Sequence, residues 1–180
     1  PAGTDFVGGH PMAGSEESGY EAARPELFAG AAWALVGEGE PAARVARLVR
    51  ALGAAPVACD ATAHDRVVAL TSHLPQLLAT ALAAELETVA AAGEPLAAAL
   101  LGPGGRDFLR LAGGSFAVWG DILEHNRAEV ERALEGVRGR ATLPAAALEE
   151  EFAAARRFAA RLADRRPVIA RSGATKQSRR

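Results

Sequence analysis

A histidine lies inside a run of small residues near the start of the chain, in the stretch GGHPMAGSEESG of residues 8–19. Glycine lets a backbone come close to another group, and histidine is the side chain that exchanges a proton most readily near neutral pH. The stretch can therefore be a site that brings side chains close to a ligand. Taken alone, it fits better as a plain turn in which His10 ends a strand.

Other polar residues in the first half could also do chemistry, but each has a structural explanation. His64 and Asp65 fall in the first turn of a predicted helix, where a carboxylate suits the helix dipole. Ser72 and Gln76 lie four residues apart on one face of the same helix, beside a leucine stripe. Such a pair is more often satisfied within its helix than by a ligand.

The second half offers a basic cluster and an amide. Arg106, Asp107 and Arg110 follow a glycine turn and can form a surface ion pair worth less than about 1 kcal/mol. Asn126 falls within an apolar helical stripe, a costly place for an amide without hydrogen-bond partners. The single cysteine, Cys59, cannot form an internal disulfide, which favours a reducing cytoplasm. We expect it to be a small buried side chain, and we expect no metal site.

The composition is typical of a soluble globular protein. The 180 residues are 49% hydrophobic and 23% charged, with a formal net charge of −2. This charge gives no basic field to attract nucleic acid, no apolar run reaches the roughly 20 residues of a membrane span, and no secretory signal opens the chain. We therefore expect neither nucleic acid nor a membrane as a partner. Separately, we expect residues 169–180 to form a solvated, disordered basic tail.

Two groups of elements must position these residues. Before Asp60, the predicted elements are a strand over 4–9, one or two helical turns over 20–28, a strand over 31–37, a helix from Pro41 to Gly53 and a strand over 56–60. This order indicates part of an α/β sheet, too small to be complete.

Long amphipathic helices follow. The predicted elements are a helix that begins at Asp60 or Thr62 and runs to Leu86, a glycine-rich loop over 100–115, and helices over 116–137 and 148–162. Pro75 should kink the first helix, because proline removes a backbone hydrogen bond. Helices with little else to cover them favour helix-on-helix packing and a partner chain.

Together, these stretches resemble the prephenate dehydrogenase family, which includes arogenate and cyclohexadienyl dehydrogenases. The matching segments, in the family's order, are FVGGHPMAGSEESG (6–19), LFAGAAWALV (27–36), HDRVVALTSHLPQLLATAL (64–82) and GGRDFLRLAGGSFAVWGDILEHN (104–126). The resemblance implies an α+β fragment that is mainly α. Residues 1–59 would be the closing strands of a Rossmann-type nucleotide-binding domain, and residues 60–168 an all-helical domain that forms a homodimer.

The resemblance implies an oxidative decarboxylation that depends on NAD or NADP, in which prephenate becomes 4-hydroxyphenylpyruvate on the route to tyrosine. By motif match, His10 accepts the proton of the substrate hydroxyl. Gly8, Gly9 and Pro11 would bind the cofactor: the glycines let the backbone approach the nicotinamide, and Pro11 fixes the direction in which the chain leaves.

The helical domain would supply the substrate contacts. Arg110 matches the family's carboxylate-binding arginine, and Ser72 matches a serine that lines the cleft between domains. Gln76 stands where many bacterial members have a histidine, and glutamine cannot carry a positive charge. The choice between prephenate and arogenate, and any inhibition by tyrosine, therefore stay open. Packing and loop support are the expected roles of Trp119, Asp121 and Asn126.

Two alternatives accompany this interpretation. The enzyme can be an arogenate dehydrogenase, or the chain can be a non-catalytic dimerisation or regulatory module if 180 residues are its natural length. The presence of His10, Ser72 and Arg110 together disfavours the second alternative. The chain has no GxGxxG motif after a strand, and the family's serine that orients the catalytic histidine would precede Pro1. We therefore expect these residues alone neither to bind nicotinamide tightly nor to turn over.

Overall fold

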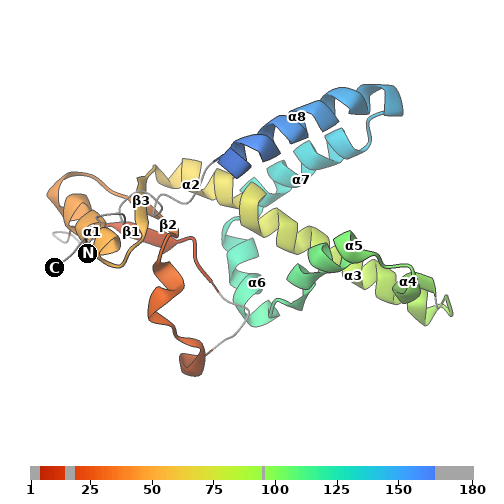
Figure 1. The fold of residues 1–180 in the computed structure, drawn as a ribbon, viewed down its shortest axis with the longest axis horizontal. Coiled ribbons are helices and arrows are strands. Elements are labelled where there is room, and N and C mark those ends of the chain that lie inside the picture. The colour runs from red at the N-terminus through yellow and green to blue at the C-terminus, as the bar shows by residue number, and fades with distance from the viewer. Residues whose placement is uncertain (1–4, 15–18, 95, 165–180) are drawn as a thin grey trace, which may run out of the picture. The chain divides into compact units, whose positions relative to one another are not determined.

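The computed structural model describes residues 5–14, 19–94 and 96–164 (Figure 1). The chain divides into two compact units, one of residues 1–64 with 145–180 and the other of residues 65–144. The described part is mostly helical and contains one small sheet, which confirms the predicted fold class. The predicted basic tail lies outside the described residues.

A three-stranded sheet lies in the first unit. Its strands are β1 (Gly8–Pro11), β2 (Ala32–Val36) and β3 (Ala55–Ala58), in the order β1-β2-β3. Strands β1 and β2 are antiparallel, with His10 opposite Ala34, whereas β2 and β3 are parallel. A parallel pair needs a crossover connection, which the helix α1 (Gly39–Ala51) supplies.

The predicted position of the first strand is wrong. The strand covers 8–11 rather than 4–9, because its backbone pairs with β2 as far as Pro11, which lies opposite Trp33. His10 therefore lies inside a strand and not at its end. Two short 3-10 turns, η1 (Tyr20–Ala22) and η2 (Pro25–Phe28), confirm the helical turns expected between the first two strands.

The helix α1 closes the core of the first unit. It begins at Gly39, two residues before the predicted start at Pro41, and it ends before Gly53, whose φ of +79° is a conformation that favours glycine. The buried core residues are Leu35, Val49 and Ala54. Phe28 and Trp33 pack against them and against each other, with ring centroids 5.1 Å apart.

A long helical run follows the sheet, and it is distorted where the sequence predicts a kink. Its parts are α2 (Ala61–Val68), a π-helical turn η3 (Ala69–His73) and α3 (Leu74–Ala91). The Oδ1 atom of Asp60 accepts the backbone N–H of Ala63 at 2.8 Å, which confirms Asp60 as the N-cap. The wide turn comes just before Pro75, which has no N–H to continue the regular pattern.

The run Ala61–Ala91 is long and apolar enough to cross a membrane, by length and composition alone. This finding differs from the prediction that no apolar run reaches the length of a membrane span. A core helix of a soluble protein passes the same test, and 33% of the most apolar window is buried within the structure. This helix is therefore only weak evidence for a membrane-spanning segment.

The remaining helices correct two predictions. They are α4 (Leu96–Ala99), α5 (Pro103–Leu109), a 3-10 turn η4 (Arg110–Gly113), α6 (Phe116–His125), α7 (Arg127–Ala141) and α8 (Ala145–Asp164). The predicted loop over 100–115 is largely helical, because Pro103 occupies the first turn of α5, where its fixed φ suits a helix. The predicted helix over 116–137 is two helices, separated at Asn126.

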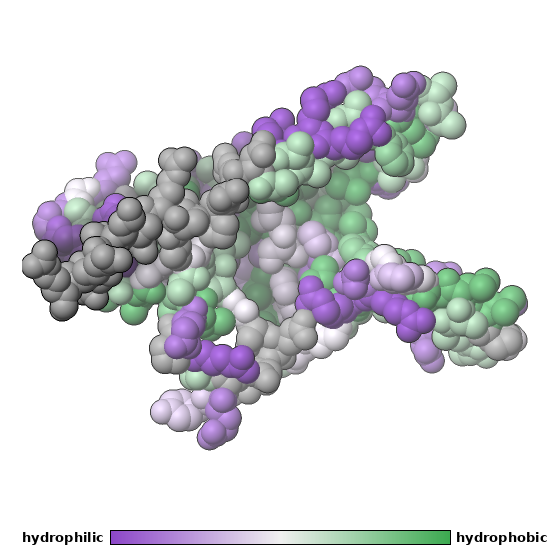
Figure 2. All heavy atoms as spheres, in the orientation of Figure 1, coloured by the Kyte–Doolittle hydropathy of each residue, from purple (hydrophilic) through white to green (hydrophobic). Residues whose placement is uncertain are grey.

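The second unit has a small core and much uncovered apolar surface. Its hydrophobic core cluster consists of the buried residues Ala69, Leu74, Val130 and Ala133, from the long helical run and α7. Phe116 remains 85% exposed and Leu100 76% exposed. Figure 2 shows apolar surface, in green, over the helices. A unit with this much exposed apolar surface is suited to pack against another chain.

Candidate active site

The first unit brings two histidines into contact. His10 lies on β1, and the cap at Asp60 starts α2 so that His64 falls in its first turn. The Nδ1 atom of His10 is 2.8 Å from the Nε2 atom of His64, a hydrogen-bond distance. The rings meet edge to face, with centroids 5.1 Å apart and planes at 67°.

Both histidines line one cavity in the first unit. Its volume is about 270 Å³, and its lining residues are Phe6, Gly8, Gly9, His10, Ala34, Val36, Ala61 and His64. The two imidazoles are the titratable groups among these residues, and the other walls are apolar or glycine backbone. The volume is slightly below the roughly 300 to 1,000 Å³ typical of drug-sized ligands, so the cavity can hold a single ring.

Burial lowers the pKa of His10 below its ordinary value of 6.5, and the charge of His64 lowers that pKa further. Burial acts this way because the charged imidazolium loses hydration, and a second histidine opposes another positive charge beside it. His10 is therefore a neutral imidazole at neutral pH. It can accept a proton from a ligand in the cavity.

The glycines before His10 have a packing explanation. A Cβ atom added at Gly9 would lie 3.0 Å from Nε1 of Trp33, and one added at Gly8 would lie 3.4 Å from Cβ of Val36. The Nε1 atom of Trp33 is buried and has no hydrogen-bond partner among the described residues. Gly9 thus lies against the Nε1 atom of the Trp33 indole. A role of Gly8, Gly9 and Pro11 in binding a cofactor stays a prediction.

The described residues fit only one end of a nicotinamide dinucleotide. The cavity beside His10 has room for one ring, and its apolar walls suit the flat face of a nicotinamide. A site for the phosphates would need a glycine-rich loop that opens a helix after a strand, with backbone N–H groups facing the anion. Gly8, Gly9 and Pro11 form a paired strand instead.

In the second unit, Gln76 is an interior residue. Its side chain belongs to α3 and is 5% exposed, and its Nε2 donates to Oγ1 of Thr80 at 3.3 Å. A Cβ atom added at Gly114 would lie 2.9 Å from Nε2 of Gln76 and 2.6 Å from Nε1 of Trp119. A larger residue at position 114 would therefore require the amide of Gln76 and the indole of Trp119 to shift.

Ser72 and Arg110 belong to the same unit as Gln76. Ser72 is half-buried in the π-helical turn η3, one turn before Gln76. Arg110 is exposed and begins η4, a turn that packs against α3. Three of the predicted site residues therefore lie on two segments in contact, whereas His10 belongs to the other unit.

Asn126 is paired, as its costly position requires. Its Nδ2 donates to the backbone oxygen of Asp65 at 2.8 Å and lies 3.1 Å from Nδ1 of His73, which is 8% exposed. The bond makes Nδ1 of His73 an acceptor, so the ring carries its proton on Nε2. The ring of His73 meets Trp119 edge to face at 6.3 Å. The predicted roles of Asn126 and Trp119 are packing and loop support.

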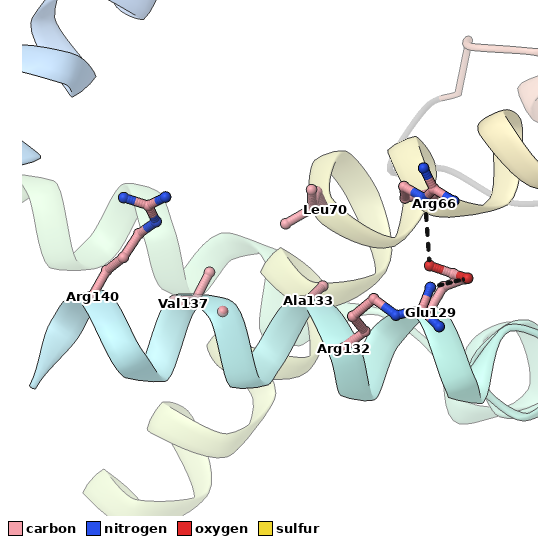
Figure 3. A pocket seen from close by; sticks show the side chains of 8 residues that line it. Arg66, Leu70, Glu129, Arg132, Ala133, Val137 and Arg140 are labelled. Carbon is pink, nitrogen blue, oxygen red and sulfur yellow. Dashed lines mark hydrogen bonds and ion pairs between the residues drawn. The ribbon is translucent and has the colours of Figure 1, made fainter.

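A separate pocket in the second unit contains none of the predicted site residues. Figure 3 shows it between the long helical run and α7, with an apolar floor of Leu70, Ala133 and Val137. Its volume is about 280 Å³, and Glu129 forms ion pairs with Arg66 and Arg132 at its edge. Among the residues that the structure describes, no group of three or more metal-ligating side chains is present.

Comparison with known families gives two matches in chain order. The family model described as "Prephenate dehydrogenase, nucleotide-binding domain" matches residues 1–57, and the one described as "Prephenate dehydrogenase, dimerization domain" matches residues 60–164. The chain is 45% identical over 134 residues to the probable prephenate dehydrogenase NovF of Streptomyces niveus, covering 72% of this chain and 36% of that protein. It spans about a third of the length of the curated relatives that it matches.

Solved structures of similar fold include prephenate and arogenate dehydrogenases. Prephenate dehydrogenase from Aquifex aeolicus, in complex with hydroxyphenyl propionate and NAD+, is 28% identical with a TM-score of 0.65, over 91% of this chain and 54% of that one. Synechocystis arogenate dehydrogenase is 29% identical with a TM-score of 0.62, over 76% of this chain and 51% of that one. The similar folds therefore include enzymes named for either substrate.

Proposed function

This chain belongs to the prephenate dehydrogenase family, and on that premise we propose that it supplies the proton acceptor and the carboxylate anchor for oxidative decarboxylation of prephenate. The observation that carries the proposal is His10, a neutral imidazole held in a ring-sized cavity by β1. NAD is the proposed hydride acceptor, supported by the nucleotide-binding family model and the NAD+ complex of the Aquifex enzyme. NADP is the alternative.

In the proposed reaction, His10 first accepts a proton and later donates it back. The Nε2 atom of His10 takes the hydroxyl proton as the ring carbon that bears this hydroxyl becomes a carbonyl. Bound nicotinamide would supply the acceptor for the hydride that leaves this carbon. The carboxylate on the ring then departs as carbon dioxide, and its bonding electron pair makes the ring aromatic with a phenolate oxygen. That oxygen takes the proton back from His10, so no net proton is released.

Substrate binding falls to the second unit in this proposal. Prephenate carries two carboxylates, and the guanidinium of Arg110 can hold one through two parallel hydrogen bonds. Ser72 would also contact the substrate. Gln76 gives this chain a neutral amide at a position where a histidine can be charged, so the amide bears on the choice between prephenate and arogenate.

The proposed function is tested by following NADH absorbance with the full-length protein, first with prephenate and then with arogenate. We expect turnover of prephenate with NAD. Turnover of arogenate alone would make the enzyme an arogenate dehydrogenase. A folded protein that oxidises neither substrate would indicate a non-catalytic dimerisation or regulatory module.

The acid limb of the pH profile should lie below pH 6.5. The pKa of His10 is lowered, so its neutral, proton-accepting form persists to a lower pH than in free histidine. The free energy of unfolding should also fall as the pH drops below about 6.5, because the unfolded chain then binds more protons at this position. The test is kcat/KM between about pH 5 and pH 8. A midpoint at or above 6.5 would contradict the assignment.

Replacing Gln76 with histidine should change substrate preference. A histidine there can carry a positive charge. This charge favours prephenate over arogenate, because the ammonium group of arogenate makes its net charge less negative. We expect the ratio of kcat/KM for prephenate to that for arogenate to rise about 10-fold. Thr80→Val is the matched control, because it removes the partner of Gln76 without adding a charge. An equal ratio in all three proteins would exclude position 76 from substrate choice.

We also propose a homodimer formed through the helical domain. The uncovered apolar side chains of the second unit, among them Phe116 and Val118, support it, as does the family model described as a dimerization domain. A cytoplasmic location and the absence of nucleic-acid and membrane partners stay predictions from composition. Sedimentation of the full-length protein tests the dimer.

A further inference from the structure

In the contact between His10 and His64, one of the two ring nitrogens of His10 forms a hydrogen bond and is not available to a ligand. The Nδ1 atom of His10 is 2.8 Å from Nε2 of His64, so a single proton lies between these two atoms. The Nε2 atom of His10 is then the ring nitrogen left for a ligand. Which of the two histidines donates decides whether that nitrogen carries a lone pair or a proton.

The two arrangements have opposite chemical consequences. If His64 donates from Nε2, the neutral ring of His10 carries its proton on its own Nε2 and can only donate to a ligand. If His10 donates from Nδ1, its Nε2 has a free lone pair and can accept a proton. A proton acceptor in the cavity therefore requires His64 to be the hydrogen-bond acceptor.

Apart from His10, the titratable groups on the strands and on α2 belong to α2 and its cap. Strands β1, β2 and β3 carry no titratable side chain other than His10. On α2, His64 is followed by Asp65 and Arg66, and the carboxylate of Asp60 is engaged by the backbone at the helix N-terminus. His64 is held firmly because its own N–H donates to the backbone oxygen of Asp60 at 3.0 Å.

We propose that His64 is a positioning residue of the site: its Nε2 accepts the Nδ1 proton of His10 and thereby keeps the Nε2 lone pair of His10 directed at the ligand. This inference rests on the proposed function of His10 as proton acceptor. When His10 takes up a proton, the bond to His64 also holds the imidazolium ring in place. The arrangement corresponds to the carboxylate that orients a catalytic histidine elsewhere, with an imidazole nitrogen as the acceptor.

The test compares His64→Leu with His64→Gln in the full-length protein. Leucine fills similar space without an acceptor, whereas the side-chain oxygen of glutamine can reach the place of Nε2 and accept the proton of His10. For His64→Leu, we expect kcat to fall about 10-fold to 100-fold while KM changes less than about 3-fold. For His64→Gln, we expect kcat within about 5-fold of the wild type. His125→Leu is the control, since that ring bonds Asp121 on its own helix.

A second readout does not depend on turnover. Nitrogen-15 NMR of the histidine rings, with the His10 signals identified from their loss in His10→Asn, reports which ring nitrogen carries the proton. We expect the proton of neutral His10 on Nδ1 in the wild type and in His64→Gln, and mainly on Nε2 in His64→Leu. The acid limb should also move to higher pH in His64→Leu, because a cause of the lowered pKa of His10 is removed.

The kinetic and NMR measurements distinguish a failure of the proposed function from a failure of the positioning role of His64. A wild-type protein that turns over neither substrate refutes the proposed function, yet the NMR measurement still decides the arrangement of the pair. A wild-type His10 with its proton on Nε2, or a His64→Leu protein with unchanged proton position and unchanged kcat, would overturn the positioning role. An equal loss of kcat in the leucine and glutamine variants would show that His64 acts through packing alone.

Discussion

Replacing His10 with asparagine should lower kcat by about 100-fold to 10,000-fold, the range expected when a positioned acid or base is lost. Asparagine can still reach His64 near the place of Nδ1, but it has no atom that accepts a proton where Nε2 lies. KM should change little, because the proposed carboxylate anchor, Arg110, belongs to the other unit. The measurement is the initial rate of NADH formation by the full-length protein at saturating substrate.

His125→Asn is the matched control for this prediction. It makes the same chemical change at a histidine of α6 that bonds only the backbone oxygen of Asp121 among the interactions described. Its kcat should stay within about 2-fold of the wild type. If His10→Asn also kept most of its turnover, His10 would have no part in the proton transfer.

Replacing Arg110 with glutamine should raise KM for prephenate by about 10-fold to 100-fold, with a smaller loss of kcat. Glutamine keeps a hydrogen-bond donor but loses the charge and the paired geometry of the guanidinium, so it binds a carboxylate more weakly. The effect falls on KM because this interaction is made with the bound substrate as well as with the transition state. Steady-state kinetics with varied prephenate measure it.

Arg106→Gln separates the loss of a specific anchor from the loss of any nearby positive charge. Arg106 lies four residues earlier, on α5, and its Nε donates to the backbone oxygen of Leu101 at 3.1 Å. Its replacement should leave KM within about 3-fold of the wild type. Equal increases in the two variants would mean that a general positive field attracts the substrate, and an unchanged KM for Arg110→Gln would place the anion elsewhere.

The elements with a strong local signal could be predicted from sequence. Strand β2 is a continuous apolar run, and α1 is bounded by a proline near its start and by Gly53, which takes a positive φ just after its end. The cap at Asp60 and the distortion before Pro75 follow from side-chain chemistry within a few residues. Patterns of this kind need no information from distant parts of the chain.

The wrong predictions concern elements whose ends depend on contacts with residues far away in the sequence. The helix α6 ends before Asn126, whose amide contacts Asp65 and His73, 61 and 53 positions earlier. The apolar stripe through 116–137 gives no sign of this break. The first strand extends to Pro11 because β2 offers it a partner there. Glycines at 104 and 105 suggest a loop, yet α5 forms with Pro103 in its first turn.

The candidate site shows the same division. The motifs around His10 and Arg110 are enough to propose a role for each, whereas the pairing of His10 with His64 could not be predicted, because 54 residues separate them. That pairing depends on the register of β1 against β2 and on the point at which α2 begins. The sequence alone indicates only a histidine in the first turn of a helix.

The most direct test of the proposed reaction is its stoichiometry. The full-length protein, incubated with prephenate and NAD, should form one 4-hydroxyphenylpyruvate and one carbon dioxide for each NADH, and His10→Asn should lower all three together. Formation of NADH without release of carbon dioxide would contradict an oxidative decarboxylation. A folded wild-type protein that forms none of the three products from prephenate would contradict the proposed function itself.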